Sequence, residues 1–178
     1  MLLQRNVRNV GTLGLSEKSN ERLFYKRRVI IGREAFNKIR QSVVFADNKY
    51  ETGGVLIGYA LWKWYFVVEV TTSDVHIKSK VSFFLDGNEH TQKVNEIIST
   101  SKYQPSVLGI WHSHICDGHS FSKQDMISNK VFAKSFGGML SMLVTKPEKD
   151  IVFSTKYISS IGIAERCITK IRLKSERR

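Results

Sequence analysis

The chain has 178 residues, 42% of them hydrophobic, with 28 Lys and Arg against 16 Asp and Glu for a net charge of +12. This length predicts one domain with its own core, and the apolar content excludes global disorder. Two cysteines exclude a disulfide framework and favour a reducing compartment. No apolar run approaches the ~18 residues of a membrane span and no signal peptide is evident, so we expect a cytoplasmic protein without a membrane partner.

The excess of positive charge lies at both ends of the chain. Residues 1–34 carry 8 basic and 3 acidic side chains, residues 165–178 carry 6 and 2, and the segment between them is nearly balanced. Because residues 1–25 are polar and show no periodicity, we interpret them as a flexible or loosely packed arm. Residues 26–178 are predicted to form the folded domain, which ends in a basic C-terminal tail.

Hydrophobic periodicity predicts strands that alternate with helices. Strands are predicted at residues 28–31, 55–59, 64–71, 80–86, 106–111, 139–145, 151–154 and 161–173. Helices are predicted at residues 33–46, 88–101 and 122–136. The glycine pair at 137–138 is a typical end for the last helix. This order, with hairpins toward the C-terminus, predicts an α/β fold: a single mixed β-sheet domain flanked by helices.

Two histidines follow the predicted strand 106–111. Side chains two residues apart in a strand point to the same face, so His112 and His114 are expected to present their imidazoles side by side. Asp125 comes eleven residues later, in the first turn of the next helix, and the intervening loop can bring it back to them. Two nitrogens and one oxygen suit a zinc ion and leave a fourth position for water.

Simpler interpretations remain open at this point. Ser122 and Asp125 have the spacing of a capping box at a helix start, and a lone His-x-His pair also occurs as ordinary polar surface. His76 and His90 are interpreted as surface or cap residues. A zinc nucleobase deaminase is excluded, because its His-x-Glu and Pro-Cys-x-x-Cys motifs are absent from the sequence.

An acidic residue beside a glycine turn completes a longer pattern. Glu51 begins the segment ETGGVLIG, and His-x-His, seven residues, Ser, two residues and Asp follow in order. This pattern resembles the signature of the JAMM (JAB1/MPN/Mov34) zinc metalloproteases and extends, with its surrounding elements, over about residues 28–155. Ile115 and Phe121 stand where members often have proline, which affects the shape of the loop and leaves the chemistry intact.

The resemblance implies a role for each polar position. His112, His114 and Asp125 would hold one Zn²⁺ ion, which lowers the pKa of its bound water to about 7. Glu51 would act as the general acid and base. Ser122 would donate a hydrogen bond to the developing oxyanion, a contribution of about 10²–10³ in rate.

The resemblance also implies a fold and a substrate. The fold would be the MPN/JAB (cytidine-deaminase-like) architecture, with the peptidase domain in residues 26–178. The function would be cleavage after the C-terminal glycine of a ubiquitin-like protein, in deconjugation or precursor processing, so the expected partner is that protein or its conjugate. The compact length is similar to that of the deconjugating peptidase of bacterial cyclic-oligonucleotide anti-phage operons, which suggests a role in anti-phage defence.

Two functions of other classes are alternatives. A non-catalytic MPN scaffold would bind a ubiquitin-like partner without metal, but such a protein is expected to have lost ligand positions that this chain retains. A basic nucleic-acid-binding protein would carry its positive charge throughout the fold. Because the charge here lies at the chain ends, we do not expect nucleic acid as a partner.

Overall fold

A computed structural model of the protein describes residues 26–46, 50–73, 87–115, 120–146 and 151–172. The predicted N-terminal arm, the strand at 80–86, His76 and the end of the basic tail lie outside these residues. In chain order the elements are β1 (Arg28–Gly32), α2 (Arg33–Ala46), β2 (Gly53–Leu61), β3 (Trp64–Val70), α3 (Gly87–Thr100), β4 (Ser106–His114), α4 (Lys123–Phe136), β5 (Gly138–Thr145), β6 (Val152–Ser159), β7 (Ala164–Arg166) and β8 (Ile168–Arg172).

The eight strands form one mixed sheet, which confirms the predicted fold class. Their order is β7-β6-β5-β4-β2-β3-β1-β8. The pairs β1–β3, β1–β8 and β4–β5 are parallel, and the other neighbours are antiparallel. None of the helices in the described part of the chain is long and apolar enough to cross a membrane.

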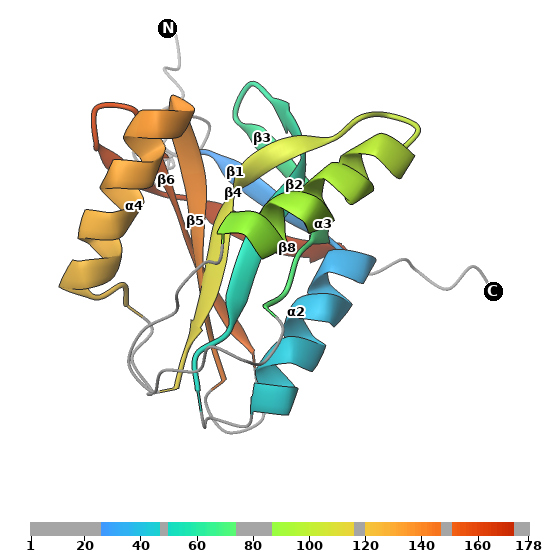
Figure 1. The fold of residues 1–178 in the computed structure, drawn as a ribbon. Coiled ribbons are helices and arrows are strands. Elements are labelled where there is room, and N and C mark those ends of the chain that lie inside the picture. Colours follow the sequence, from blue (N-terminus) through green and yellow to red (C-terminus); the bar gives the residue numbers. More distant parts are fainter. Residues whose placement is uncertain (1–25, 47–49, 74–86, 116–119, 147–150, 173–178) are drawn as a thin grey trace, which may run out of the picture.

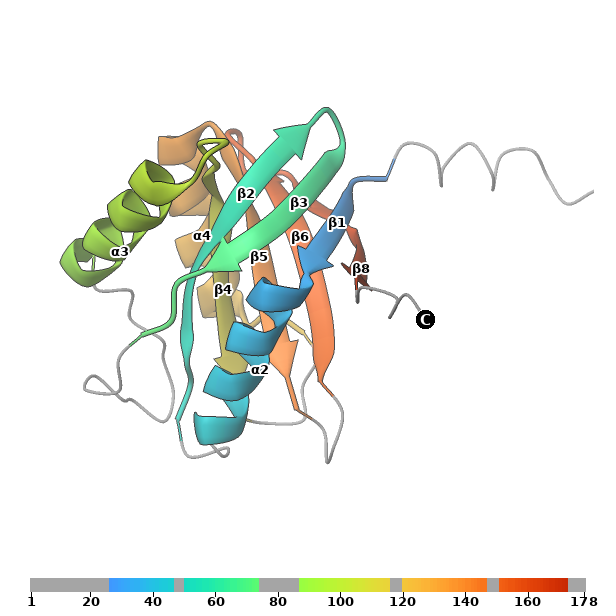
Figure 2. The ribbon, with the colours of Figure 1, turned by 90° about the vertical axis from the view of Figure 1, so that its right-hand side faces the viewer.

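The three helices divide between the two faces of the sheet (Figures 1 and 2). Leu56 on β2 points into the main core, where α2 packs through Ile39 and Val43. Its neighbours Val55 and Ile57 point to the opposite face, where they pack against α3. Helix α4 covers that same face over β5 and β6. Strand β4, with neighbours on both sides, therefore lies in the middle of a covered sheet.

Two C-terminal elements differ from the prediction. Strand β6 runs to Ser159, beyond the predicted end at residue 154, because every residue of β6 has a partner on β5. The expected strand 161–173 is divided at Cys167 into β7, which pairs with β6, and β8, which pairs with β1. Apolar periodicity locates a strand but does not report this change of partner.

The two ends of the sheet meet at Cys167. Its backbone N–H donates to the carbonyl of Thr155 on β6 at 2.8 Å, while Ile168 N–H donates to the carbonyl of Arg27 at 2.9 Å. The Arg27 guanidinium lies over the ring of Tyr157, 3.6 Å from its centroid, and donates to the hydroxyl of Tyr65 at 2.9 Å. The sheet thus curls around the main core, and Arg27 joins strands that are distant in the sheet order.

Burial at this closure suppresses the reactivity of the Cys167 thiol. Burial raises the pKa of Cys167 to about 12. At pH 8 a thiol with this pKa is ionised to only about 10⁻⁴, and the thiolate is the reactive form. In a Cys116→Ser variant we expect Cys167 to resist a thiol-specific reagent until the protein unfolds. Rapid native-state labelling, measured against the same variant in denaturant, would show that the closure is open in solution.

Candidate metal centre

Both histidines of the predicted motif lie at the C-terminal end of strand β4, with their side chains close together. Its pairing with β2 and β5 extends to His112, and its pairing with β5 continues to His114. The two imidazole centroids are 5.1 Å apart. His112 is buried, with 5% of its surface exposed, and His114 is half-buried. The strand alternation that predicted neighbouring imidazoles therefore holds to the end of β4.

Asp125 is held by the start of α4. Its backbone N–H donates to the Ser122 hydroxyl at 3.0 Å, and Ser122 N–H donates to Asp125 Oδ2 at 2.7 Å, so the capping box is formed. The same carboxylate faces both histidines: Oδ1 lies 3.4 Å from His112 Nε2, and Oδ2 lies 3.1 Å from His114 Nε2. The cap and the cluster are thus compatible, because one carboxylate serves both.

The surroundings of Asp125 favour its ionised form. Burial alone would raise the pKa of this carboxyl, but the hydrogen bonds with His114 and Ser122 and the close His112 imidazole, 3.4 Å away, outweigh burial and hold the pKa well below its usual range. The carboxylate therefore carries a negative charge at neutral pH. An ionised oxygen beside two imidazole nitrogens is a donor set that divalent transition metals accept.

The cluster fits a single metal ion by two further observations. One ligand atom from each of His112, His114 and Asp125 lies within 4.8 Å of the other two. Ligands of a tetrahedral Zn²⁺ with bonds of about 2.0–2.1 Å would stand about 3.3 Å apart, so small side-chain adjustments suffice. In addition, His112 Nε2 is buried without a hydrogen-bond partner. A metal ion would satisfy its lone pair, whereas leaving it unsatisfied is costly.

Ser113, between the histidines, fixes the chain beside Glu51. Its backbone N–H donates to the carbonyl of Thr52 at 2.7 Å, and its hydroxyl accepts from Thr52 N–H at 2.9 Å. Gly53, the next residue, pairs with His112. The half-buried Glu51 is thereby placed at the same end of the sheet as the histidines, two residues before the strand next to theirs. It is not a member of the metal-binding group found among the described residues.

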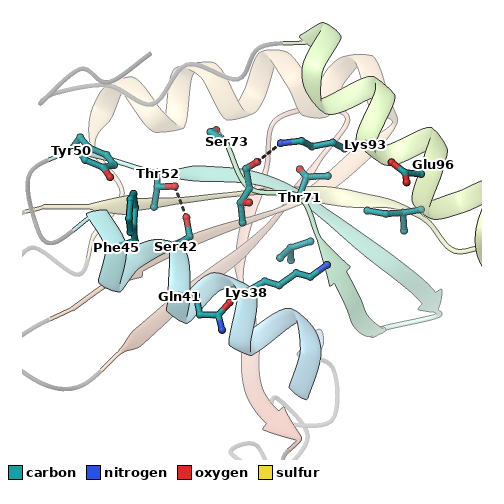
Figure 3. Close-up of a pocket in the computed structure, with 13 residues that line it drawn as sticks. Lys38, Gln41, Ser42, Phe45, Tyr50, Thr52, Thr71, Ser73, Lys93 and Glu96 are labelled. Carbon is teal, nitrogen blue, oxygen red and sulfur yellow. Dashed lines mark hydrogen bonds between the residues drawn. The ribbon is translucent and has the colours of Figure 1, made fainter. Parts of the chain in front are cut away.

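A groove lies beside this end of the sheet (Figure 3). It has a volume of about 700 Å³ and runs between α2 and α3, with Thr52 in its wall. The Thr52 hydroxyl is 2.7 Å from that of Ser42, and the Lys93 ammonium donates to the carbonyl of Thr72 at 3.1 Å. Glu51, His112, His114 and Asp125 are not among the residues that line the groove, and Thr52, the residue after Glu51, is its nearest link along the chain to the candidate centre.

His90 was predicted as a surface or cap residue, and this is wrong. It is 2% exposed, with Nδ1 at 2.6 Å from the Thr71 hydroxyl and Nε2 at 3.4 Å from that of Ser73. Ser73 N–H in turn donates to the carbonyl of Gly53 at 3.0 Å, so this buried chain of contacts supports the start of β2. The hydrophobic periodicity of α3 places His90 on the same face as Val94, which packs against the sheet. The polarity of the imidazole favours an exposed position, and the sequence does not show the two hydroxyl groups that it meets on burial.

Comparison with known proteins identifies related sequences and folds. Residues 33–152 match the family model described as prokaryotic homologs of the JAB domain. The solution structure of protein DSY2949 from Desulfitobacterium hafniense superposes with a TM-score of 0.65 at 17% identity, covering 83% of this chain and 95% of that one. At that identity the likeness concerns the fold alone. No curated protein matches the sequence.

Metal binding tests the roles of the three clustered residues. We expect the protein to bind one Zn²⁺ per chain, as measured by elemental analysis, and to melt at a higher temperature with the metal than with a chelator. His112→Ala and Asp125→Asn should abolish the stoichiometric binding. Ser122→Ala is the matched control: it removes the cap, at about 1 kcal/mol of stability, and keeps all three ligands. Full binding by His112→Ala would contradict the assignment.

The link between Ser113 and Thr52 predicts an effect on stability that is separate from the metal. Ser113→Ala leaves the buried Thr52 N–H without its acceptor, at a cost of about 1–3 kcal/mol in the free energy of unfolding. Metal stoichiometry should not change, because the Ser113 side chain points away from the histidines. Ser42→Ala, which removes only a side-chain contact of Thr52, should cost less. Denaturant titration of both variants checks the difference, and equal losses would contradict it.

Proposed function

Because the chain belongs to the family of prokaryotic homologs of the JAB domain, we propose that it is a zinc-dependent peptidase. It cleaves an isopeptide or peptide bond after the C-terminal glycine of a ubiquitin-like protein. The observation that carries this proposal is the cluster of His112, His114 and Asp125 at the end of β4, next to the strand that begins after Glu51. A ligand group beside a separate carboxylate suits metal-assisted hydrolysis, in which the metal activates water and the carboxylate transfers the proton.

Each side chain of the site has a separate role in the proposed hydrolysis. When bound, Zn²⁺ supplies a water of lowered pKa and polarises the scissile carbonyl. Glu51 takes a proton from the attacking water and delivers it to the leaving amine, as a general base and then a general acid. The exposed Ser122 hydroxyl accepts a hydrogen bond from Asp125 N–H and keeps its own hydrogen for the oxyanion.

The groove between α2 and α3 supports an extended substrate. A flexible C-terminal tail can lie along it toward Thr52 and reach Glu51 with its last residues. The preference for a tail that ends in glycine is part of this proposal and comes from the resemblance to the JAMM metalloproteases.

A substitution at Glu51 tests the catalytic role. The substrate is a ubiquitin-like protein ending in Gly-Gly and joined to a reporter by either a peptide or an isopeptide bond. We expect Glu51→Gln to reduce kcat by about 10²–10⁴-fold, because the proton transfers are lost, and to bind the same amount of metal. Glu34→Gln, an exposed glutamate in the first turn of α2, is the matched control.

The outcomes separate the possible functions. Cleavage by the wild type and not by Glu51→Gln supports the peptidase. Binding of the ubiquitin-like protein without cleavage, at full metal content, would identify a non-catalytic scaffold. Equal activity of Glu51→Gln and the wild type would refute the mechanism.

A further inference from the structure

A lysine from β6 lies beside the candidate centre. The Lys156 ammonium stands over the ring of Phe121, 4.9 Å from its centroid, and the Phe121 ring meets the His112 imidazole edge-on with centroids 5.9 Å apart. The side chains of Lys156 and Phe121 are half-buried. Phe121 thus separates a positive charge from a predicted metal ligand by the width of one aromatic ring.

The Lys156 ammonium has no carboxylate partner among the described residues. Its other contact is the thioether sulfur of Met126, at 3.6 Å. The lysines of the groove differ, since Lys38 pairs with Glu69 at 2.8 Å and Lys93 pairs with Glu89 at 2.6 Å. A half-buried ammonium held only by a ring and a sulfur keeps most of its capacity to bind an anion.

The position of Lys156 in the sheet assigns it to one side of the scissile bond. In the strand order β6-β5-β4-β2, Lys156 lies two strands from the histidines on one side, and β2, preceded by Glu51, lies on the other. The groove proposed to receive the substrate tail is lined by residues of α2, α3 and the end of β3, and it includes Thr52, just before β2. A substrate that approaches from this side and crosses the histidines carries the part beyond its scissile bond toward Phe121 and Lys156.

We propose that Lys156, seated on Phe121, is a specificity-determining residue that binds a carboxylate in the leaving part of the substrate. This rests on the proposed function and goes beyond it by naming a chemical preference. The two centroid distances place the ammonium within about 11 Å of the His112 ring, a span of about three extended residues. The carboxylate is an Asp or Glu side chain at the second or third position after the bond, or the C-terminal carboxylate of a short extension.

The experiment compares fusions that differ only in this charge. A ubiquitin-like protein ending in Gly-Gly carries a short extension with Glu or Gln at its second and third positions, and the extension ends in either a free carboxylate or an amide. We expect the wild type to prefer an acidic extension about five- to tenfold in kcat/KM, mainly through KM, with the preference falling as salt rises. The free and amidated arms identify which carboxylate is used.

Three variants assign the preference to one side chain. Lys156→Met keeps the apolar stem against Phe121 and Met126 and should lose the preference for acid. Lys156→Arg should retain it. Lys134→Gln, an exposed lysine in the last turn of α4, is the matched control and should behave as the wild type. A preference that survives in Lys156→Met, or is absent from the wild type, overturns the proposal.

A binding measurement separates this proposal from the proposed function. The anisotropy of a fluorescent acidic peptide, with its Gln counterpart as reference, reports binding even where no fusion is cleaved. Acid-selective binding that Lys156→Met abolishes would uphold the subsite while cleavage fails. Equal binding of the two peptides by the wild type would refute the Lys156 subsite, whether or not the protein cleaves the fusions.

Discussion

The antiparallel pairing of β2 with β4 is the constraint on which the candidate site depends. Two hydrogen bonds join Ser113 to Thr52, one through the serine backbone and one through its hydroxyl. They hold Glu51, the residue before Thr52, beside the histidines, although about sixty residues separate these positions in the sequence. Since β-pairing is periodic in two residues, a slip of one residue would turn both imidazoles to the other face of the sheet.

The second constraint is local to α4. A helix start needs acceptors for its free N–H groups, and a metal site of the His-His-Asp kind would need an ionised carboxylate in a fixed position. The capping box formed by Ser122 and Asp125 meets the first need and also holds the Asp125 carboxylate against two imidazoles. The geometry is therefore compatible with both a capping and a metal-binding role for Asp125, which are alternatives from the sequence alone.

The sequence predicted local and repeated features better than pairings of single residues. Periodicity located α2 at its observed bounds and anticipated the strand that carries His112 and His114, because one apolar face of each element is buried. The burial of His90 and the placement of Lys156 over Phe121 were not foreseen. Each depends on a partner far away in the chain, and residue type and spacing carry no information about such partners.

Buried polar side chains lie between α4 and the sheet on the way to the candidate centre. Near the end of α4, Ala133 packs with Met139 of β5 in an apolar cluster. One helical turn and two strand residues closer to the site, the buried side chains are Asn129 and Ser141, and neither Asn129 Nδ2 nor Ser141 Oγ has a hydrogen-bond partner in the described structure.

The next level closer to the site holds His112, whose Nε2 also lacks a hydrogen-bond partner. Buried polar groups without a hydrogen-bond partner cost stability. Sequences that violate the rules of core packing usually do so at functional sites. Asn129, Ser141 and His112 therefore mark a series of buried polar side chains that ends at the candidate centre, among apolar neighbours that include Met126 and Leu143.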